Sequence, residues 1–158
     1  MVKIIGILLY LLISFNISIG KGLCAPDFVL KDENGKVVHL YENKGKGKVL
    51  MFCKTTCRRC IELLPFLREI YKNYKDKFDF YFIFIDTVDI NKIKKTKKEW
   101  GLEQIPALIM DTEVLKKYRV LGSPTFFILD KDLKIKGMFL GKKRIRKMEL
   151  ILKKLTKN

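Results

Sequence analysis

Two apolar runs, VLMFC at 49–53 and FDFYFIFID at 78–86, constrain the fold of this chain more than any other feature. Continuous apolar runs of this length are typical of strands buried on both faces of a sheet. Strands that alternate with helices indicate an α/β fold around a mixed sheet. The segment between the two runs repeats apolar residues every three or four positions, which predicts an amphipathic helix carrying Ile61, Leu64, Leu67, Ile70, Tyr71 and Tyr74.

The rest of the chain continues this alternation. Segment 25–40 is predicted to form a β-hairpin, because two short apolar runs flank a turn signal at Asn34-Gly35. Further elements are predicted in chain order: a helix at 90–101 closed by Gly101, a short helix at 111–120, strands within 123–130 and 135–141, and a last helix with Ile145, Met148, Leu152 and Leu155 on one face.

The length of 158 residues suits a single domain, and the sequence contains no internal repeat. We assign residues 25–156 to one globular domain. Pro65 lies inside the first predicted helix, and we expect it to kink that helix because proline lacks a backbone N–H donor.

The chain carries a formal net charge of +16, with lysine-rich clumps at 44–48, 92–98 and 142–147. Such a charge suits either nucleic acid or an anionic membrane surface. These clumps fall in different predicted elements and form no single stripe, so we interpret them as solvated surface and expect no nucleic-acid partner.

The first twenty residues differ from the rest. A basic start is followed by an apolar stretch and then small residues, as in a secretory signal. Ser18 and Gly20 suit cleavage before Lys21, and an uncleaved membrane anchor is the alternative. A third possibility is a lipid anchor, in which Cys24 would be the modified residue, although Leu23 stands where a small residue is expected. With a cleaved signal, a membrane anchor or a lipid anchor, the domain would be exported to a compartment where disulfides persist.

Three of the four cysteines, Cys53, Cys57 and Cys60, follow one another with the spacing C-x3-C-x2-C. Cys57 and Cys60 fall where a strand ends and a helix begins. Unpaired N–H groups at a helix start stabilise a thiolate, which makes Cys57 the predicted nucleophile and Cys60 the resolving thiol. A buried structural bridge or half of a zinc site are the alternatives. The only histidine is His39, so zinc lacks ligands, and we expect neither metal nor cofactor.

Pro124 follows Gly122-Ser123 and starts a predicted strand, where we expect a cis peptide bond. Together these features resemble the thioredoxin superfamily, and within it the TlpA/ResA-type thiol–disulfide oxidoreductases. The segments that carry the resemblance are APDFVLKDENGKVVHL, VLMFCKTTCRRCIELLP and the stretch from EWGLEQIPALIM to GMFLG.

The resemblance implies a thioredoxin fold with an N-terminal hairpin and a redox-active Cys57–Cys60 disulfide. It also implies that Ser123 and Pro124 line the substrate groove and that the protein is periplasmic and close to the membrane. We therefore expect a monomeric exported oxidoreductase that exchanges electrons with cysteines of envelope proteins. Reduction is favoured over oxidation, with a membrane electron donor.

The sequence departs from the family pattern at the site itself. Thr56 replaces the usual tryptophan, Arg58-Arg59 replace a pair that commonly contains proline, and Leu63 occupies the position of a buried glutamate. Glu62 is expected to be a surface residue, because helical geometry points it elsewhere.

Arg58 and Arg59 have three possible roles: they favour the Cys57 anion and hold its pKa below about 8.5, they bind acidic substrates, or they are ordinary surface residues. Cys53 is predicted to be a small buried hydrophobe, with a third reactive thiol as the alternative. Cys24 is placed outside the chemistry.

Three rival functions remain open at this point. An SCO-type copper-delivery domain would use the C-x3-C spacing of Cys53 and Cys57, but it lacks a downstream histidine. A thiol peroxidase would need proline and threonine where Leu50 and Lys54 stand. The third rival is a binding module in which Cys57–Cys60 is only structural.

Overall fold

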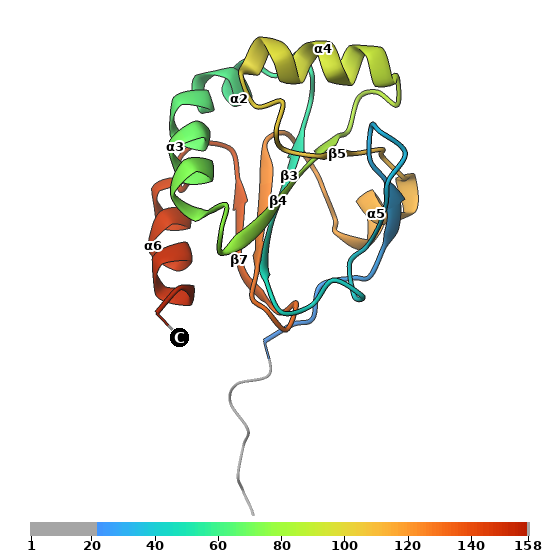
Figure 1. The fold of residues 1–158 in the computed structure, drawn as a ribbon. Helices are drawn as coiled ribbons and strands as arrows, with labels where there is room; N and C mark the ends of the chain where they lie inside the picture. Colours follow the sequence, from blue (N-terminus) through green and yellow to red (C-terminus); the bar gives the residue numbers. More distant parts are fainter. Residues whose placement is uncertain (1–21, 158) are drawn as a thin grey trace, which may run out of the picture.

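The computed structural model describes residues 22–157, which form a mixed five-stranded sheet with helices on both sides (Figure 1). The strand order is β5-β4-β3-β6-β7; β3, β4 and β5 run parallel, and β6 and β7 pair antiparallel beside β3. The predicted α/β fold with a mixed sheet is therefore confirmed. Its strands are β3 (Gly47–Cys53), β4 (Phe78–Phe84), β5 (Ala107–Leu108), β6 (Thr125–Leu129) and β7 (Ile135–Leu140).

Two apolar clusters, one on each face of the sheet, make up the core. One face is covered by α2 (Arg58–Glu62), α3 (Leu64–Tyr74), α4 (Ile90–Trp100) and α6 (Arg146–Leu155). The other face is covered by α5 (Thr112–Lys117) and by the hairpin of β1 (Val29–Lys31) and β2 (Val37–His39). The central strand β3 is buried along its whole length, as its apolar sequence predicts.

The helix predicted after β3 is two helices rather than one kinked helix. α2 ends at Glu62, Leu63 bridges the two in helical conformation, and Pro65 lies in the first turn of α3. Proline is tolerated in a first turn, where its missing N–H has no intrahelical partner in any case. The chain therefore ends one helix and starts another where we expected a bend.

Strand β5 was not predicted, because two residues are too short for an alternating pattern to register. It forms the edge of the sheet and holds the hairpin there. Glu33, in the hairpin turn, forms a buried ion pair with Lys97 of α4, and its other carboxylate oxygen accepts the Ala107 N–H at 2.8 Å. The predicted hairpin is confirmed, with its turn at Gly35 in the left-handed region.

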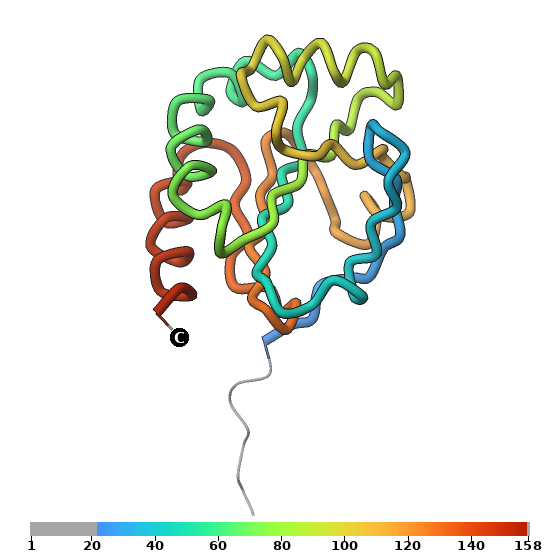
Figure 2. Tube along the Cα trace, in the orientation of Figure 1, coloured from blue at the N-terminus to red at the C-terminus, as the bar shows by residue number. Residues whose placement is uncertain are grey.

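The chain enters the domain at the end of the sheet opposite to α2 (Figure 2). The carbonyl of Leu23 accepts the N–H of Ile135, at the start of β7, at 2.9 Å. The signal or anchor predicted for residues 1–20 lies outside the described residues. Among residues 22–157, no helix has the length and apolar character needed to cross a bilayer.

Candidate active site

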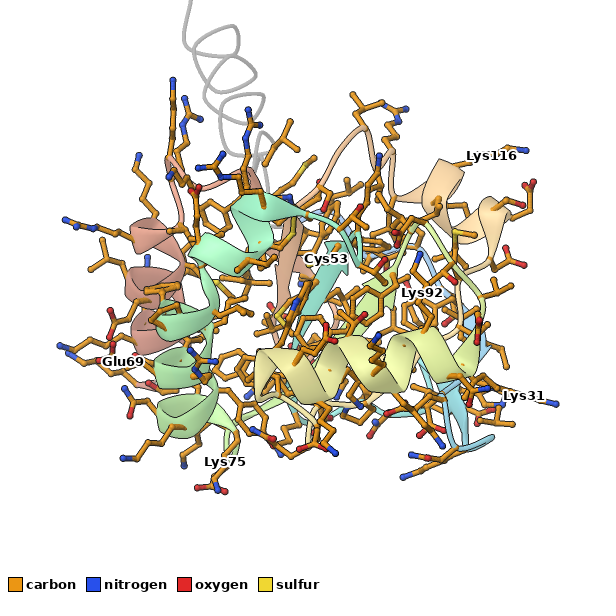
Figure 3. The ribbon with its side chains drawn as sticks, turned by 90° about the horizontal axis from the view of Figure 1, so that it is seen from above. Lys31, Cys53, Glu69, Lys75, Lys92 and Lys116 are labelled. Carbon is orange, nitrogen blue, oxygen red and sulfur yellow. A yellow bond between two sulfur atoms is a disulfide. The ribbon has the colours of Figure 1, made fainter. Side chains whose placement is uncertain are left out.

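The C-terminal end of β3 lies at the centre of the sheet, and the loop 54–57 leads from it into α2. Figure 3 looks down on this end, with Cys53 near its centre and α4 running across it. In a parallel arrangement the carboxyl ends of neighbouring strands lie together, so loops from β3 and β4 meet here. The turn before β6 reaches the same place, because β6 is antiparallel to β3.

Cys57 and Cys60 form a disulfide, with their Cα atoms 5.2 Å apart. Cys57 is the N-cap residue of α2: its Sγ accepts the N–H of Cys60 at 3.2 Å, and its side chain is half-buried. Cys60 is fully buried in the core. The two sulfurs therefore differ in access: a partner approaching from solvent meets Cys57 and not Cys60.

The peptide bond between Ser123 and Pro124 is cis, as predicted. The Ser123 hydroxyl lies against the disulfide. Ser123 Oγ accepts the Lys54 N–H at 2.9 Å and lies 3.2 Å from Cys60 Sγ. Because a disulfide sulfur carries no proton, the Ser123 hydroxyl is the donor in this contact with Cys60. The turn before β6 thus supplies a polar side-chain group that contacts Cys60.

Asp86, just after β4, is a site residue that the sequence analysis missed. Its carboxylate accepts hydrogen bonds from the Thr55 N–H at 3.0 Å and the Thr55 hydroxyl at 2.7 Å, and it faces Lys92 at 3.8 Å. Partial burial raises the pKa of Asp86, but the bonds from Thr55 and the Lys92 charge outweigh it and hold that pKa below its usual value. The sequence feature that could have indicated Asp86 is an acidic residue at the end of the apolar run 78–86.

The two arginines next to Cys57 point into solvent. Arg58 is 93% exposed in its side chain and pairs with Glu62 on its own helix at 3.5 Å. Glu62 also binds Lys142, and this hydrogen bond, with the nearby positive charges, lowers the Glu62 pKa. Glu62 is therefore an ion-paired surface residue, as expected from helical geometry.

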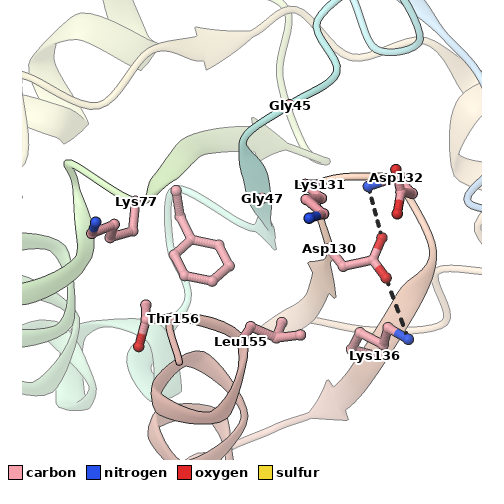
Figure 4. Close-up of a pocket in the computed structure, with 10 residues that line it drawn as sticks. Gly45, Gly47, Lys77, Asp130, Lys131, Asp132, Lys136, Leu155 and Thr156 are labelled. Carbon is pink, nitrogen blue, oxygen red and sulfur yellow. Dashed lines mark hydrogen bonds and ion pairs between the residues drawn. The ribbon is translucent and has the colours of Figure 1, made fainter. Parts of the chain in front are cut away.

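Arg59 lines a pocket of about 430 Å³ beside α2, together with the turn between β7 and α6. The other residues that line it are Leu140, Gly141, Lys142 and Lys143. A second pocket of about 290 Å³ lies at the opposite end of the sheet, where Lys77 and Lys131 are among its lining residues (Figure 4). The lining of that second pocket contains no cysteine.

Cys53, the last residue of β3, is completely buried among apolar side chains. Burial raises the pKa of the Cys53 thiol, and the Asp86 charge raises it further. Leu63, which stands where the family pattern has glutamate, is also buried in this cluster. The predicted role of Cys53 as a small buried hydrophobe is confirmed.

Comparison with known proteins gives the family. The AhpC/TSA family model matches residues 22–138. A thiol–disulfide oxidoreductase ResA from Bacillus thuringiensis subsp. konkukian is 36% identical over 133 residues, which are 84% of this chain and 76% of that protein. The Bacillus subtilis ResA is 33% identical over 128 residues, covering 78% of this chain and 69% of that protein.

Solved structures agree on the fold. The thioredoxin domain of a thiol–disulfide oxidoreductase from Bacteroides vulgatus has a TM-score of 0.71 at 25% identity and covers 85% of this chain and 99% of that chain. A thiol:disulfide interchange protein from Chlorobium tepidum has a TM-score of 0.74 at 22% identity, covering 86% and 97%. The chain therefore belongs to the AhpC/TSA family and, within it, to the ResA group of thiol–disulfide oxidoreductases with a thioredoxin fold.

Proposed function

We propose that Cys57 and Cys60 are the catalytic pair of this oxidoreductase, with Cys57 as the nucleophile and Cys60 as the resolving thiol. One observation carries the proposal: the two cysteines are bonded across the first turn of α2, with only Cys57 accessible to a partner. The Cys60 N–H, which donates to Cys57 Sγ at 3.2 Å, favours negative charge on that sulfur in the reduced protein.

In the reductive direction, the Cys57 thiolate attacks one sulfur of a substrate disulfide. A mixed disulfide forms, and the other substrate sulfur leaves as a thiolate. Cys60 then loses its proton and attacks Cys57 Sγ, which releases the second substrate thiol and forms the Cys57–Cys60 disulfide. Two electrons pass to the substrate, so a dithiol donor must reduce Cys57–Cys60 before the next cycle.

Ser123 and Pro124 are proposed to shape the substrate groove beside Cys57. The Ser123 hydroxyl has a second role, because it lies 3.2 Å from Cys60 Sγ. A hydroxyl that donates to a sulfur stabilises the thiolate of Cys60 as it forms, which supports resolution of the mixed disulfide. Leu63 leaves no carboxylate at the position of the family's glutamate, so this hydroxyl takes on greater importance.

We propose that the enzyme works outside the cytoplasm on cysteines of envelope proteins, as a monomer supplied with electrons by a membrane donor. The apolar segment at 4–19, preceded by a basic residue, supports export. Entry of the chain beside the start of β7 supports an orientation in which the disulfide faces away from an anchor. A domain of residues 25–156 is the functional unit in this proposal.

The geometry weighs against the copper-delivery alternative. That function would join Cys53 and Cys57 at one metal, but Cys53 is buried in the core and Cys57 is bonded to Cys60. Within residues 22–157, no three side chains of histidine, cysteine, aspartate or glutamate gather as a metal site.

The first test is the reduction potential of the Cys57–Cys60 couple, measured on residues 22–158 in glutathione and dithiothreitol buffers, together with insulin reduction. We expect a reversible two-electron couple near or below about −250 mV, in the range of thioredoxin-like reductases. A value above about −180 mV would reverse the proposed direction. Absence of a reversible couple would overturn the catalytic proposal.

A further inference from the structure

We propose that the surface around Cys57 selects acidic, cysteine-bearing segments of partner proteins. This inference rests on the proposed function and names the class of substrate that the same site takes. The surface consists of five cationic side chains and three exposed apolar ones, and we call it the basic rim. Its members are Lys54, Arg58, Arg59, Lys142 and Lys143, with Ile61, Leu121 and Leu140.

The charges of the basic rim are largely uncompensated. Glu62 pairs with Arg58 and Lys142, and within residues 22–157 it is the one carboxylate that forms an ion pair with any of these five cations. Among residues 22–157, no carboxylate lies within 4 Å of the side-chain nitrogens of Lys54, Arg59 or Lys143. Asp86 is occupied by Thr55 and Lys92. A partner with carboxylates would therefore find free cations on approach.

Part of the basic rim lines a pocket in which these charges could bind an acidic side chain. Arg59, Lys142 and Lys143 line the 430 Å³ pocket, together with Leu140 and Gly141. An acidic side chain in that pocket would meet cations from both α2 and the turn after β7. Arg59 is two residues after Cys57 at the start of α2, so an acidic residue bound in this pocket would lie on the same side of the helix start as the reacting cysteine's neighbour Arg59.

The apolar members of the basic rim suit a protein segment. Leu121 is 90% exposed just before Gly122-Ser123, and Leu140 is 57% exposed at the end of β7. Leu140 lies against Gly122: a Cβ atom added at Gly122 would be 3.4 Å from the Cδ1 atom of Leu140. Large exposed apolar side chains beside a reactive group mark a contact surface. An extended segment with apolar and acidic residues around its cysteine matches this combination.

The position of the basic rim argues for protein rather than anionic lipid as its partner. Leu140 lies at the end of β7, whereas Leu23 is bonded to Ile135 at the start of the same strand. Those two ends are roughly 17 Å apart at the usual rise per residue. A membrane reached through the residues before Gly22 would face the opposite end of the domain (Figure 1).

The test uses residues 22–158, reduced and freed of reductant, and three peptides that share one internal disulfide. The residues flanking that disulfide are acidic, neutral or basic. Single-turnover reduction is followed at low salt and at about 0.5 M salt, where screening shortens the reach of charges to a few ångströms. We expect the acidic peptide to react about tenfold faster than the basic one at low salt, with the ratio falling at high salt.

Two variants that lose the same number of positive charges distinguish an effect of the basic rim from an effect of the overall net charge. The rim variant is Lys54→Gln, Arg59→Gln, Lys143→Gln. Its matched control changes Lys77, Lys131 and Lys153 to Gln, at the opposite end of the sheet and on α6; these lysines are also exposed and make no ion pair within residues 22–157. The rim variant should lose most of the preference for acidic peptides, and the control should keep it.

Equal rates for the three peptides, or an equal loss in both variants, would overturn the inference while leaving the proposed function standing. Failure to reduce any of the three peptides would overturn the proposed function, and this inference with it. Sedimentation with phosphatidylglycerol and phosphatidylcholine vesicles tests the lipid alternative. Binding to the anionic vesicles that the rim variant alone loses would assign the surface to lipid and reject a protein partner.

Discussion

Cys53 and the Cys57–Cys60 pair lie within eight residues of one another, but their polar contacts and their access to solvent differ. Cys53 ends a buried strand, and burial among apolar side chains raises its pKa. Cys57 begins a helix, is half-buried, and accepts a backbone N–H. Cys60 is as buried as Cys53, but it contacts the Ser123 hydroxyl and the sulfur of Cys57.

If Cys60 is the resolving thiol, as we propose, this difference means that burial alone does not make a cysteine inert. Cys53 and Cys60 are both 0% exposed, and what separates them is the polar contact and the nearby exposed sulfur. A buried thiol without such contacts stays protonated, because its anion would lose hydration without compensation. The β3 strand therefore isolates Cys53, and the break from β3 into α2 makes Cys57 and Cys60 available for exchange.

The largest effect is expected from removing either member of the pair. Cys57→Ser should abolish insulin reduction, since it removes the accessible nucleophile of the pair, and the exposed Cys24 forms no disulfide with another cysteine in residues 22–157. Cys60→Ala should stop turnover after the first attack, and the mixed disulfide at Cys57 should accumulate and be visible by mass spectrometry. Cys53→Ala is the matched control and should retain turnover. Loss of turnover in Cys53→Ala, in a protein that remains folded, would contradict the comparison.

The second prediction uses the raised pKa of Cys53 and concerns stability at high pH. The folded protein keeps the Cys53 proton above the usual thiol pKa of about 9, whereas the unfolded chain loses it. The folded state then binds more protons, so this contribution to stability is complete below about pH 9 and is lost as pH rises further.

The measurement compares urea unfolding of the wild type and Cys53→Ala, both with the Cys57–Cys60 disulfide intact, between about pH 8 and pH 11. The wild type should lose stability more steeply, with a difference that approaches about 1.4 kcal/mol per pH unit. Absolute stabilities will differ because the alanine leaves a cavity, so only the slopes are compared. Parallel slopes would show that Cys53 ionises in the folded protein.

Much of the fold could be predicted because its signals are local. The apolar runs at 49–53 and 78–86 specified β3 and β4, and Gly101 closes α4 with a φ of 64°, as its position after the apolar repeat indicated. The exceptions have physical causes. Strand β5 is too short to show a period; it pairs with β4 on one side and contacts Asp32 and Glu33 of the distant hairpin on the other.

Only part of the candidate site could be predicted, because local spacing is visible in the sequence and contacts between distant segments are not. Cys57 and Cys60 are three residues apart, so their pairing is visible in the sequence. Ser123 lies 63 residues from Cys60, and Asp86 lies 31 residues from Thr55. Their hydrogen bonds depend on where the ends of β3 and β4 and the start of β6 lie in space, which residue spacing in the sequence does not reveal. The proline after Ser123 located that turn but gave no indication that the serine hydroxyl contacts Cys60.

Ser123→Ala tests whether the hydroxyl is what distinguishes Cys60 from Cys53. Removing a hydrogen bond worth about 1 kcal/mol should slow resolution of the mixed disulfide roughly fivefold. Stopped-flow measurement of the decay of a preformed mixed disulfide at Cys57 isolates this step, and the rate of Cys57 alkylation should stay the same. Ser123→Thr keeps the hydroxyl and should restore the rate. An equal slowing in the threonine variant would mean that packing beside Pro124, and not the hydroxyl, is responsible.

The smallest effect is expected from the arginines, although they adjoin the reactive sulfur in sequence. Arg58 is 93% exposed and already paired with Glu62, and solvent screens its field at Cys57. Arg58→Gln, Arg59→Gln should therefore raise the pH midpoint of Cys57 alkylation by only a fraction of a pH unit, and high salt should produce a similar shift in the wild type. Lys77→Gln, Lys131→Gln removes the same charge far from the site and should leave the midpoint in place. A shift of a full unit or more would show that the arginines turn toward Cys57 in the reduced protein, in which case they would contribute to its thiolate as much as the N–H of Cys60 does.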